Sequence, residues 1–396
     1  MKLRILLLLS LLGLCTLAHA QTLTVLHAFS GGSDGANPYA GVTLDSGGNI
    51  YGTAAYGGSS SDGTAFKITA RTRTFSVLNT FNLSGGTNPS SRILLGPSGL
   101  YYGATLTGST DGRGNVFSLQ PPPTICGSVS CPWTERVLYS FNSGAGYNTF
   151  GSDLAFDGSG NMYGTVAYGG DYGYGAVFEL TSNGSGGWNY SNIFSFRVGG
   201  IIPSGGPAFD SSGNIYVPTQ QGGNYSCGTV TKLSYSGGTW NEMVLHHFTC
   251  SGLGANGTLL LDSSGNIYGV SQYTDGSPST PGGVWRLTSS GVYLVLHTWS
   301  NGFGGPAAGL TTDSAGNLYG TTTGDGTFSS GNVFKLSAGT FSYTDLYDFT
   351  AGPDGAEPWC QAALDSSGNI YGTTAYGGSG YGVVWKLVPS TSQGQR

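Results

Sequence analysis

Charged residues are scarce in this chain, and acidic residues outnumber basic ones. Only 9% of the residues are charged, and 14 lysines and arginines are set against 20 aspartates and glutamates, giving a net charge of −6. The chain contains no block of basic residues. The sequence therefore predicts neither a nucleic-acid partner nor an anionic membrane surface.

Long hydrophobic runs are missing after the first twenty residues. A basic start with Lys2 and Arg4 precedes an apolar run that ends at Leu17, and a small-residue cleavage site ends at Ala20. This pattern predicts a signal peptide over residues 1–20. No later stretch reaches the roughly 18 to 20 apolar residues that span a bilayer, so we expect a secreted or periplasmic protein with no membrane span.

Residue types that carry out most enzymatic chemistry are also few. His27, His246 and His297 occupy one position of an internal repeat and so cannot converge on a single metal, and His247 neighbours His246. A Gly-x-Ser-x-Gly match at residues 31–35 lacks the strand-to-helix context of a hydrolase nucleophile. We predict no catalytic residues, no metal site and no cofactor.

Glycine and tyrosine, by contrast, are abundant and follow a period. The chain has 71 glycines and 24 tyrosines, and the tetrad Asn-Ile-Tyr-Gly or a close variant recurs seven times in steps of 51, 61, 53, 52, 51 and 52 residues. This regularity predicts a tandem repeat whose units stack. The seven tetrad tyrosines are Tyr51, Tyr102, Tyr163, Tyr216, Tyr268, Tyr319 and Tyr371.

Each unit contains four short β-patterns, which is typical of a propeller blade of about 50 residues. The first recognisable strand, Leu23–Phe29, is of the fourth type, whereas the last unit ends after its third strand. Pairing of these ends would close the ring without an unpaired edge. We therefore predict an all-β, seven-bladed β-propeller over residues 21–388, with the last blade closed by the N-terminal strand and a polar tail at residues 389–396.

The phased pattern between Asp34 and Thr69 carries a family resemblance. It reads Asp-Gly-Ala-x-Pro-Tyr-Ala-Gly, then Asp-Ser-x-Gly-Asn-Ile-Tyr-Gly-Thr, then Gly-Thr-x-Phe-Lys-Ile-Thr. The chain resembles bacterial choice-of-anchor tandem-repeat proteins of the GloVer type from Leu23 to Val388. The resemblance implies a surface or secreted protein of a family without an assigned function, and it supplies no catalytic residues. The tail after Lys386 is short and polar, so we expect secretion without attachment.

The recurrent aspartates open tight turns between the first and second strands. A carboxylate in such a turn accepts backbone N–H bonds, whereas calcium needs about 6 to 8 converging oxygens. We interpret the aspartates as turn residues. They are Asp45, Asp157, Asp210, Asp262, Asp313 and Asp365.

The cysteines fit an exported protein. Cys126 and Cys131 lie in the insertion that lengthens one repeat step to 61 residues, and we predict a local disulfide between them. Cys227 precedes a third strand and Cys250 follows the next fourth strand, so antiparallel pairing predicts a second disulfide. Cys360 is left without a partner, either buried or intermolecular.

Alternating strand directions place the long loops at one end of the ring, and tyrosines recur there. Flat aromatic faces among glycine, serine, threonine and aspartate suit sugars or peptides, although such tyrosines could equally pack between adjacent loops. We expect Asp34, Asp354 and Trp359 to shape the rim of this face. Four units carry a tyrosine five residues after the tetrad tyrosine, namely Tyr56, Tyr168, Tyr273 and Tyr376.

The sequence thus predicts a monomeric, non-catalytic propeller that binds a polysaccharide or an extracellular protein through the loop-rich face, with carbohydrate favoured. The alternative is a glycosidase or polysaccharide-lyase-like enzyme, which would need an acidic or basic cluster in one unit that breaks the repeat. The interruption at Val217-Pro218 and the 61-residue step are the visible irregularities, and neither brings catalytic residue types. A third interpretation is a surface scaffold with no small ligand.

Overall fold

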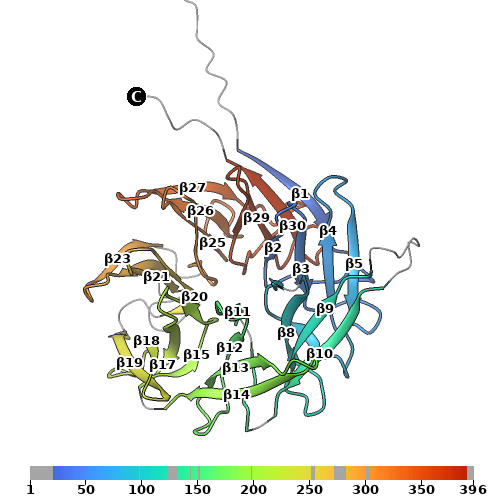
Figure 1. Cartoon of the computed structure of the whole chain (residues 1–396). Coiled ribbons are helices and arrows are strands. Elements are labelled where there is room, and N and C mark those ends of the chain that lie inside the picture. Colours follow the sequence, from blue (N-terminus) through green and yellow to red (C-terminus); the bar gives the residue numbers. More distant parts are fainter. Residues whose placement is uncertain are drawn as a thin grey trace, which may run out of the picture.

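The structure, a computed structural model, describes residues 21–97, 99–123, 132–142, 144–149, 152–197, 199–250, 255–271, 282–299 and 304–389. Within these ranges the regular secondary structure is entirely β-strand, arranged as seven antiparallel sheets in a ring (Figure 1). The predicted seven-bladed β-propeller is confirmed. No helix in these ranges could cross a membrane. The signal peptide and nearly all of the polar tail lie outside the described residues and stay predictions.

We number the blades in the order in which their first strands occur along the chain. Blades 1 to 3 consist of β2 (Val42–Leu44), β3 (Ile50–Ala54), β4 (Thr64–Ile68) and β5 (Phe75–Thr80); β6 (Thr87–Pro89), β7 (Leu94–Leu95), β8 (Tyr101–Thr107), β9 (Asn115–Gln120) and β10 (Thr134–Ser140); and β11 (Ala155–Phe156), β12 (Met162–Val166), β13 (Ala176–Ser182) and β14 (Trp188–Ser195). Blades 4 and 5 consist of β15 (Ile201–Pro203), β16 (Ala208–Phe209), β17 (Ile215–Gln221), β18 (Thr229–Ser236) and β19 (Thr239–His247); and β20 (Asn256–Leu261), β21 (Ile267–Ser271), β22 (Gly283–Leu287) and β23 (Tyr293–Thr298). Blades 6 and 7 consist of β24 (Thr311–Thr312), β25 (Leu318–Thr322), β26 (Asn332–Leu336) and β27 (Tyr343–Asp348); and β28 (Ala363–Leu364), β29 (Ile370–Thr374), β30 (Val383–Val388) and β1 (Thr22–Ala28).

Blade 7 is built from both ends of the chain. β1 pairs antiparallel with β30, with Thr22 opposite Val388 and Ala28 opposite Val383. The two strands lie side by side in Figure 1, at the blue and red ends of the colour scale. The predicted closure of the ring by the N-terminal strand is confirmed.

The core is divided among the contacts between neighbouring blades. Second strands such as β3 and β29 are buried along their whole length, because both faces of the sheet are covered by adjacent blades. One cluster joins Phe29 and Tyr371 of blade 7 to Val42 of blade 1. Fourth strands lie on the outer edge of the ring, and β19 alternates between exposed and half-buried residues over its first half.

The glycine of the tetrad is required by an aromatic ring on the third strand. A Cβ atom on Gly52 would lie 2.5 Å from Cζ of Phe66, the residue that pairs with it across the sheet. In blade 4 the glycine position is occupied by Val217, and its cross-strand partner is Thr231 instead of an aromatic residue. In blade 4 the second strand therefore has a larger side chain at this position, and the third strand has a smaller one opposite it.

Every pairing of a third with a fourth strand contains a β-bulge at the same repeat position. The register shifts by one residue, and the extra residue of the fourth strand packs against a core cluster, as Leu26 does in blade 7. Bulges increase local twist and re-aim side chains. The seven extra residues are Leu26, Leu78, Leu138, Ile193, Leu245, Leu296 and Leu346.

Candidate functional site

At the end of the ring with the short turns between first and second strands, the polar side chains form hydrogen bonds within those turns. Asp45 Oδ1 accepts the N–H groups of Gly47 and Asn49 at 2.9 and 2.8 Å. Its Oδ2 accepts Asn49 Nδ2 at 2.8 Å and the Tyr51 hydroxyl at 3.2 Å. The interpretation of these aspartates as turn residues is confirmed, and the tetrad tyrosine locks the turn. The same network recurs at Asp157, Asp210, Asp262, Asp313 and Asp365.

A cavity of about 240 Å³ lies at the other end, where the chain segments that enter the first strands of all seven blades meet. Two repeat positions supply most of its wall, the twelfth and the tenth residues before the tetrad tyrosine. At the twelfth position the wall residues are Tyr39, Ser90, Ser204, Asn256, Ala307 and Trp359. At the tenth position they are Arg92, Asp153, Thr258, Gly309 and Gln361.

In blades 2 and 7 the residue between these two positions is directed into the blade, as expected for an extended chain whose side chains alternate. The Oγ atom of Ser91 accepts the N–H of Ala104 at 2.7 Å. Cys360 occupies the same repeat position, and its Sγ accepts the N–H of Thr373 at 3.3 Å. Cys360 is a buried free thiol whose pKa is raised by burial. It takes the structural place of a serine.

Arg92 of blade 2 and Asp153 of blade 3 form an ion pair on the cavity wall. Arg92 Nη2 and Nε lie 2.7 and 2.8 Å from Asp153 Oδ2, and the Arg92 backbone N–H donates to Oδ1 at 3.0 Å. The side chains are 24% and 20% exposed. The ion pair connects blades 2 and 3 at the cavity wall, and the negative charge of Asp153 neutralises the positive charge of Arg92.

The wall is asymmetric because the repeat copies differ at these two positions. Blades 4 to 6 contribute small side chains, such as those of Ser204, Thr258 and Gly309. Gln361 of blade 7 donates through Nε2 to the Leu310 carbonyl at 2.7 Å, and its buried Oε1 has no partner among the described residues. The aromatic and charged side chains of the wall come from four consecutive blades and are Trp359, Tyr39, Arg92, Asp153 and Tyr168.

Aromatic rings from blades 7 and 1 meet at one side of the cavity. The hydroxyl groups of Tyr39 and Tyr376 lie 3.3 Å apart, and Trp359 Nε1 donates to Glu357 Oε2 at 3.2 Å. Burial, the hydrogen bond with Tyr376 and the nearby Tyr56 and Glu357 raise the pKa of the Tyr39 hydroxyl. These five side chains therefore form one connected group beside the cavity.

A second aromatic group lies at blades 2 and 3. Tyr168 lines the cavity and stacks on Tyr147 with ring centroids 5.4 Å apart. The guanidinium of Arg113 lies 4.3 Å from the centre of the Tyr147 ring. Tyr147 thus contacts both a cation and a second ring, and these contacts help to hold Tyr168 in place.

The structure places the predicted site residues in two groups. Trp359 and Tyr168 line the cavity, while Tyr56 and Tyr376 are 45% and 41% exposed at the same end of the ring. Asp34 accepts the Ser30 N–H at 3.0 Å and lies 3.0 Å from His27 Nε2, and Asp354 likewise accepts the Thr350 N–H at 2.9 Å and the Tyr347 hydroxyl at 3.0 Å. Both carboxylates brace their own loops and are not on the cavity wall. Tyr273 lies outside the described residues.

Comparison with known proteins identifies the repeat. The model of the Gloeobacter/Verrucomicrobia repeat matches residues 14–159, 150–358 and 273–395. The chain belongs to the Gloeobacter/Verrucomicrobia repeat family. This confirms the family resemblance inferred from the phased pattern.

Solved structures similar to this Gloeobacter/Verrucomicrobia repeat protein support its fold alone. The extracellular domain of a proposed one-component system from B. thetaiotaomicron matches with 13% identity and a TM-score of 0.56, over 93% of this chain and 40% of that chain. A proposed 6-phosphogluconolactonase from Bacteroides uniformis matches with 15% identity and a TM-score of 0.50, over 85% of this chain and 89% of that chain. A search of curated proteins finds no match.

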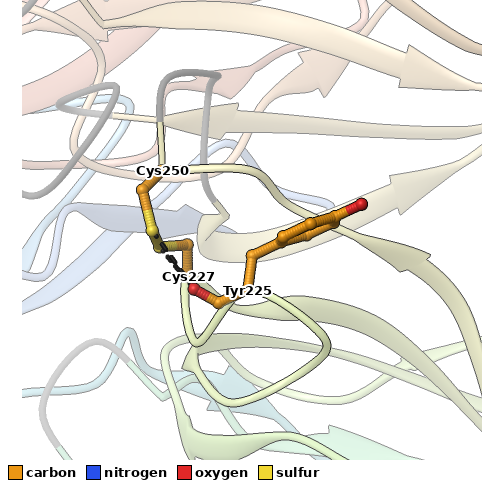
Figure 2. The surroundings of a disulfide bond; sticks show 3 residues. All are labelled: Tyr225, Cys227 and Cys250. Atoms are coloured by element: carbon orange, nitrogen blue, oxygen red, sulfur yellow. Dashed lines mark hydrogen bonds between the residues drawn. A yellow bond between two sulfur atoms is a disulfide. The ribbon is translucent and has the colours of Figure 1, made fainter.

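The cysteines of the repeat protein are partly accounted for. Cys227 and Cys250 form a disulfide, with their Cα atoms 5.3 Å apart, which confirms one of the two predictions. Figure 2 shows both sulfur atoms beside the Tyr225 carbonyl oxygen, each at 3.2 Å. A disulfide is typical of proteins outside the reducing cytosol. Cys126 and Cys131 lie outside the described residues.

The three histidines that share a repeat position pack between blades. His27 stacks on Phe75 of the next blade with ring centroids 3.6 Å apart, and His246 stacks on Tyr293 at 4.3 Å. Burial lowers the pKa of both imidazoles. In the described part of the chain, no group of three or more histidines, cysteines or carboxylates could hold a metal ion.

Blade 6 carries a carboxylate cluster that breaks the repeat, as an enzymatic site would require. Asn332 Nδ2 lies 3.3 Å from both Asp325 Oδ2 and Asp345 Oδ2, and burial and the nearby Asp348 raise the pKa of Asp345. Glycosidase carboxyl pairs stand about 5 to 9.5 Å apart. In this cluster Asp325 and Asp345 both accept from one amide nitrogen, Asn332 Nδ2, so its side chains are held by contacts with one another.

Sequence reasoning missed the cavity residues themselves. It identified the loop-rich end and two wall residues, Trp359 and Tyr168, but not Arg92, Asp153 or Gln361. A signal was present, because the tenth residue before the tetrad tyrosine varies from glycine to arginine, aspartate, threonine and glutamine while its surroundings repeat. Divergence at one phase of a duplicated unit indicates a position that packing does not determine.

Proposed function

We propose that this protein binds carbohydrate at the loop-rich end of the ring, with one sugar unit in the central cavity. The chemistry of the wall carries the proposal, because the rings of Tyr39, Tyr168 and Trp359 lie on one cavity with the polar groups of Asn256 and Gln361. Sugars present apolar C–H faces together with hydroxyl groups. Flat aromatic rings next to hydrogen-bonding side chains match both features.

The size of the cavity limits what it can hold. Pockets for drug-sized ligands enclose about 300 to 1,000 Å³, and this cavity of about 240 Å³ is smaller. A single small polar unit fits that space better than a folded chain segment. The polymer that supplies the unit would lie on the rim, where Tyr56 and Tyr376 are exposed.

The charges of the site favour a neutral sugar. The guanidinium of Arg92 is paired with Asp153, so the strongest cation on the wall is compensated. The whole chain carries a net charge of −6, which disfavours polyanionic partners. We therefore expect neutral polysaccharides to bind better than those rich in uronic acids or sulfate, in a protein that acts as a monomer in the periplasm or outside the cell.

The test is binding of the purified protein to an array of neutral and acidic glycans and polysaccharides. Trp359→Ala and Tyr168→Ala should each weaken binding about 10-fold or more, because truncation of a buried aromatic anchor removes more than about 1 kcal/mol. Tyr235→Ala is the matched control, since Tyr235 is 63% exposed in β18 at the start of the turn to β19, at the opposite end of the ring. Binding of no glycan by the parent protein would overturn the proposal and favour a protein partner.

A further inference from the structure

Six aromatic side chains at the loop-rich end lie on the cavity wall or next to an aromatic wall residue, and they come from blades 7, 1 and 3. At the position of Tyr56, blade 2 has Thr107, blade 4 has Gln221 and blade 6 has Gly324. The corresponding residue of blade 5, Tyr273, lies outside the described residues. We call the following set the aromatic crescent: Trp359 and Tyr376 of blade 7, Tyr39 and Tyr56 of blade 1, and Tyr147 and Tyr168 of blade 3.

The two arms of the aromatic crescent both begin on the cavity wall. Trp359 and Tyr39 line the cavity, and Tyr39 leads to Tyr376 through the contact between their hydroxyl groups at 3.3 Å. On the other side of the Arg92–Asp153 ion pair, Tyr168 lines the cavity and stacks on Tyr147. Aromatic surface therefore leaves the cavity in two directions.

The second arm is a departure from the repeat. Tyr147 forms an isolated bridge with Tyr168, as Ala36 does with Tyr56 and Ala356 does with Tyr376. In blades 1 and 7 an alanine at this position forms the same backbone bridge. The tyrosine side chain of blade 3 is therefore not needed to form it. The guanidinium of Arg113 lies 4.3 Å from the centre of the Tyr147 ring and pre-organises the stack, which lowers the entropy cost of binding.

We propose that the aromatic crescent binds an extended, neutral polysaccharide chain through its interior, with one unit in the cavity and neighbouring units on both arms. This inference rests on the proposed carbohydrate function and adds the mode of recognition. A protein that recognised a chain end would need aromatic surface on one side of the cavity alone. Here the units before and after the bound one each meet a ring beyond the cavity wall, Tyr376 on one arm and Tyr147 on the other.

The test uses neutral glucans, mannans and xylans, together with their oligosaccharides from monosaccharide to hexasaccharide. Affinity should rise with length until both arms are filled, and chains blocked at both ends should compete as well as unblocked chains. Tyr376→Ala and Tyr147→Ala should each weaken hexasaccharide binding about 10-fold. Tyr235→Ala, at the opposite end of the ring, should leave hexasaccharide binding unchanged.

The outcomes separate this inference from the function on which it rests. Binding that is abolished by blocking one chain end, or a monosaccharide that binds as tightly as a hexasaccharide, overturns recognition of the chain interior while leaving carbohydrate binding in place. Loss of affinity in only one of the two alanine variants also overturns it. Absence of binding to every chain overturns both proposals. Circular dichroism of each variant shows that the ring is folded.

Discussion

Carboxylate side chains in this ring have opposite responses to pH, depending on their partners. For Asp45, burial alone would raise the pKa, but hydrogen bonds from Asn49, Tyr51 and Gly47 outweigh burial and hold the pKa below its usual value. Such a group stabilises the fold at neutral pH, and its contribution is lost as the pH falls through the folded pKa. Asp345 is the reverse case, because burial and its contact with Asp348 raise its pKa to about 6.

Asp345→Asn should raise the melting temperature at about pH 8 and change it little at about pH 4. A carboxyl that holds its proton more tightly in the fold contributes stability below its unfolded pKa and loses that contribution as the pH rises through about 6. Asparagine mimics the protonated form at all pH values. Calorimetry at the two pH values tests this, and an equal shift at both would contradict it.

Asp313→Asn serves as the matched control for that experiment. Its carboxylate accepts the Asn317 amide at 2.7 Å and the Tyr319 hydroxyl at 3.0 Å, and hydrogen bonds from the Asn317 side chain and backbone outweigh burial and lower its pKa. Neutralising this side chain should destabilise the protein at neutral pH. The two variants should therefore shift the melting temperature in opposite directions at about pH 8.

At the level of the strand pair, the tetrad glycine and the aromatic ring of the third strand form one unit. In blade 6 a Cβ on Gly320 would lie 2.5 Å from Cζ of Phe334. Blade 4 has changed both members, with Val217 opposite Thr231. The repeat thus accepts glycine opposite an aromatic residue, or valine opposite threonine. Valine opposite an aromatic residue is excluded, because the valine side chain and the aromatic ring would occupy the same volume.

A double-mutant cycle on blade 6 tests this coupling. Gly320→Val alone should cost about 1 to 3 kcal/mol through overpacking, and Phe334→Thr alone about 3 to 5 kcal/mol through the cavity it leaves. The double variant should be more stable than the sum of the single costs predicts, by about 0.5 to 3 kcal/mol. Urea unfolding measures each free energy. Additive costs would show that the two positions are independent.

For the whole molecule, closure of the ring depends on one strand pair. β1 and β30 pair over six residues of each strand. Among the described residues, the sheet that contains this pair is the only one built from both ends of the chain. Opening the ring within blade 7 must break these backbone hydrogen bonds. Separating two neighbouring blades anywhere else breaks only side-chain contacts. The covalent loop that connects those two blades stays intact and keeps them close together.

A circular permutant separates these contributions. Joining Val388 to Thr22 by a hairpin loop and cutting the chain between β5 and β6 would give a ring with all strands present, in which no blade is shared by the two ends. We expect the same circular dichroism but unfolding at least about 10-fold faster, because the ring can now open without breaking a sheet. Stopped-flow unfolding in denaturant measures the rate. Equal rates for parent and permutant would show that the strand closure is not the kinetic barrier.

The fold could be predicted from the sequence because its determinants repeat. Seven tetrads in phase give the blade number, and the strand types at the two chain ends give the closure. The site could be predicted only to the loop-rich end. Arg92 and Asp153 come from different blades, and the cavity depends on residues that each occur once, so no periodic pattern encodes their contact. The expectation that Asp34 and Asp354 shape the rim stays a prediction, and local hydrogen bonds hold both carboxylates in their own loops.

The pairing of β1 with β30 also has a consequence for how the protein is made. β1 has no partner in the ring until β30 has been synthesised, because Ala28 pairs with Val383. Any chain that stops before β30 leaves β1 unpaired and two blade faces uncovered, however well the intervening blades have folded. The architecture therefore acts as a check on completeness, since a prematurely terminated chain exposes an open strand edge and apolar surface that proteases and chaperones recognise.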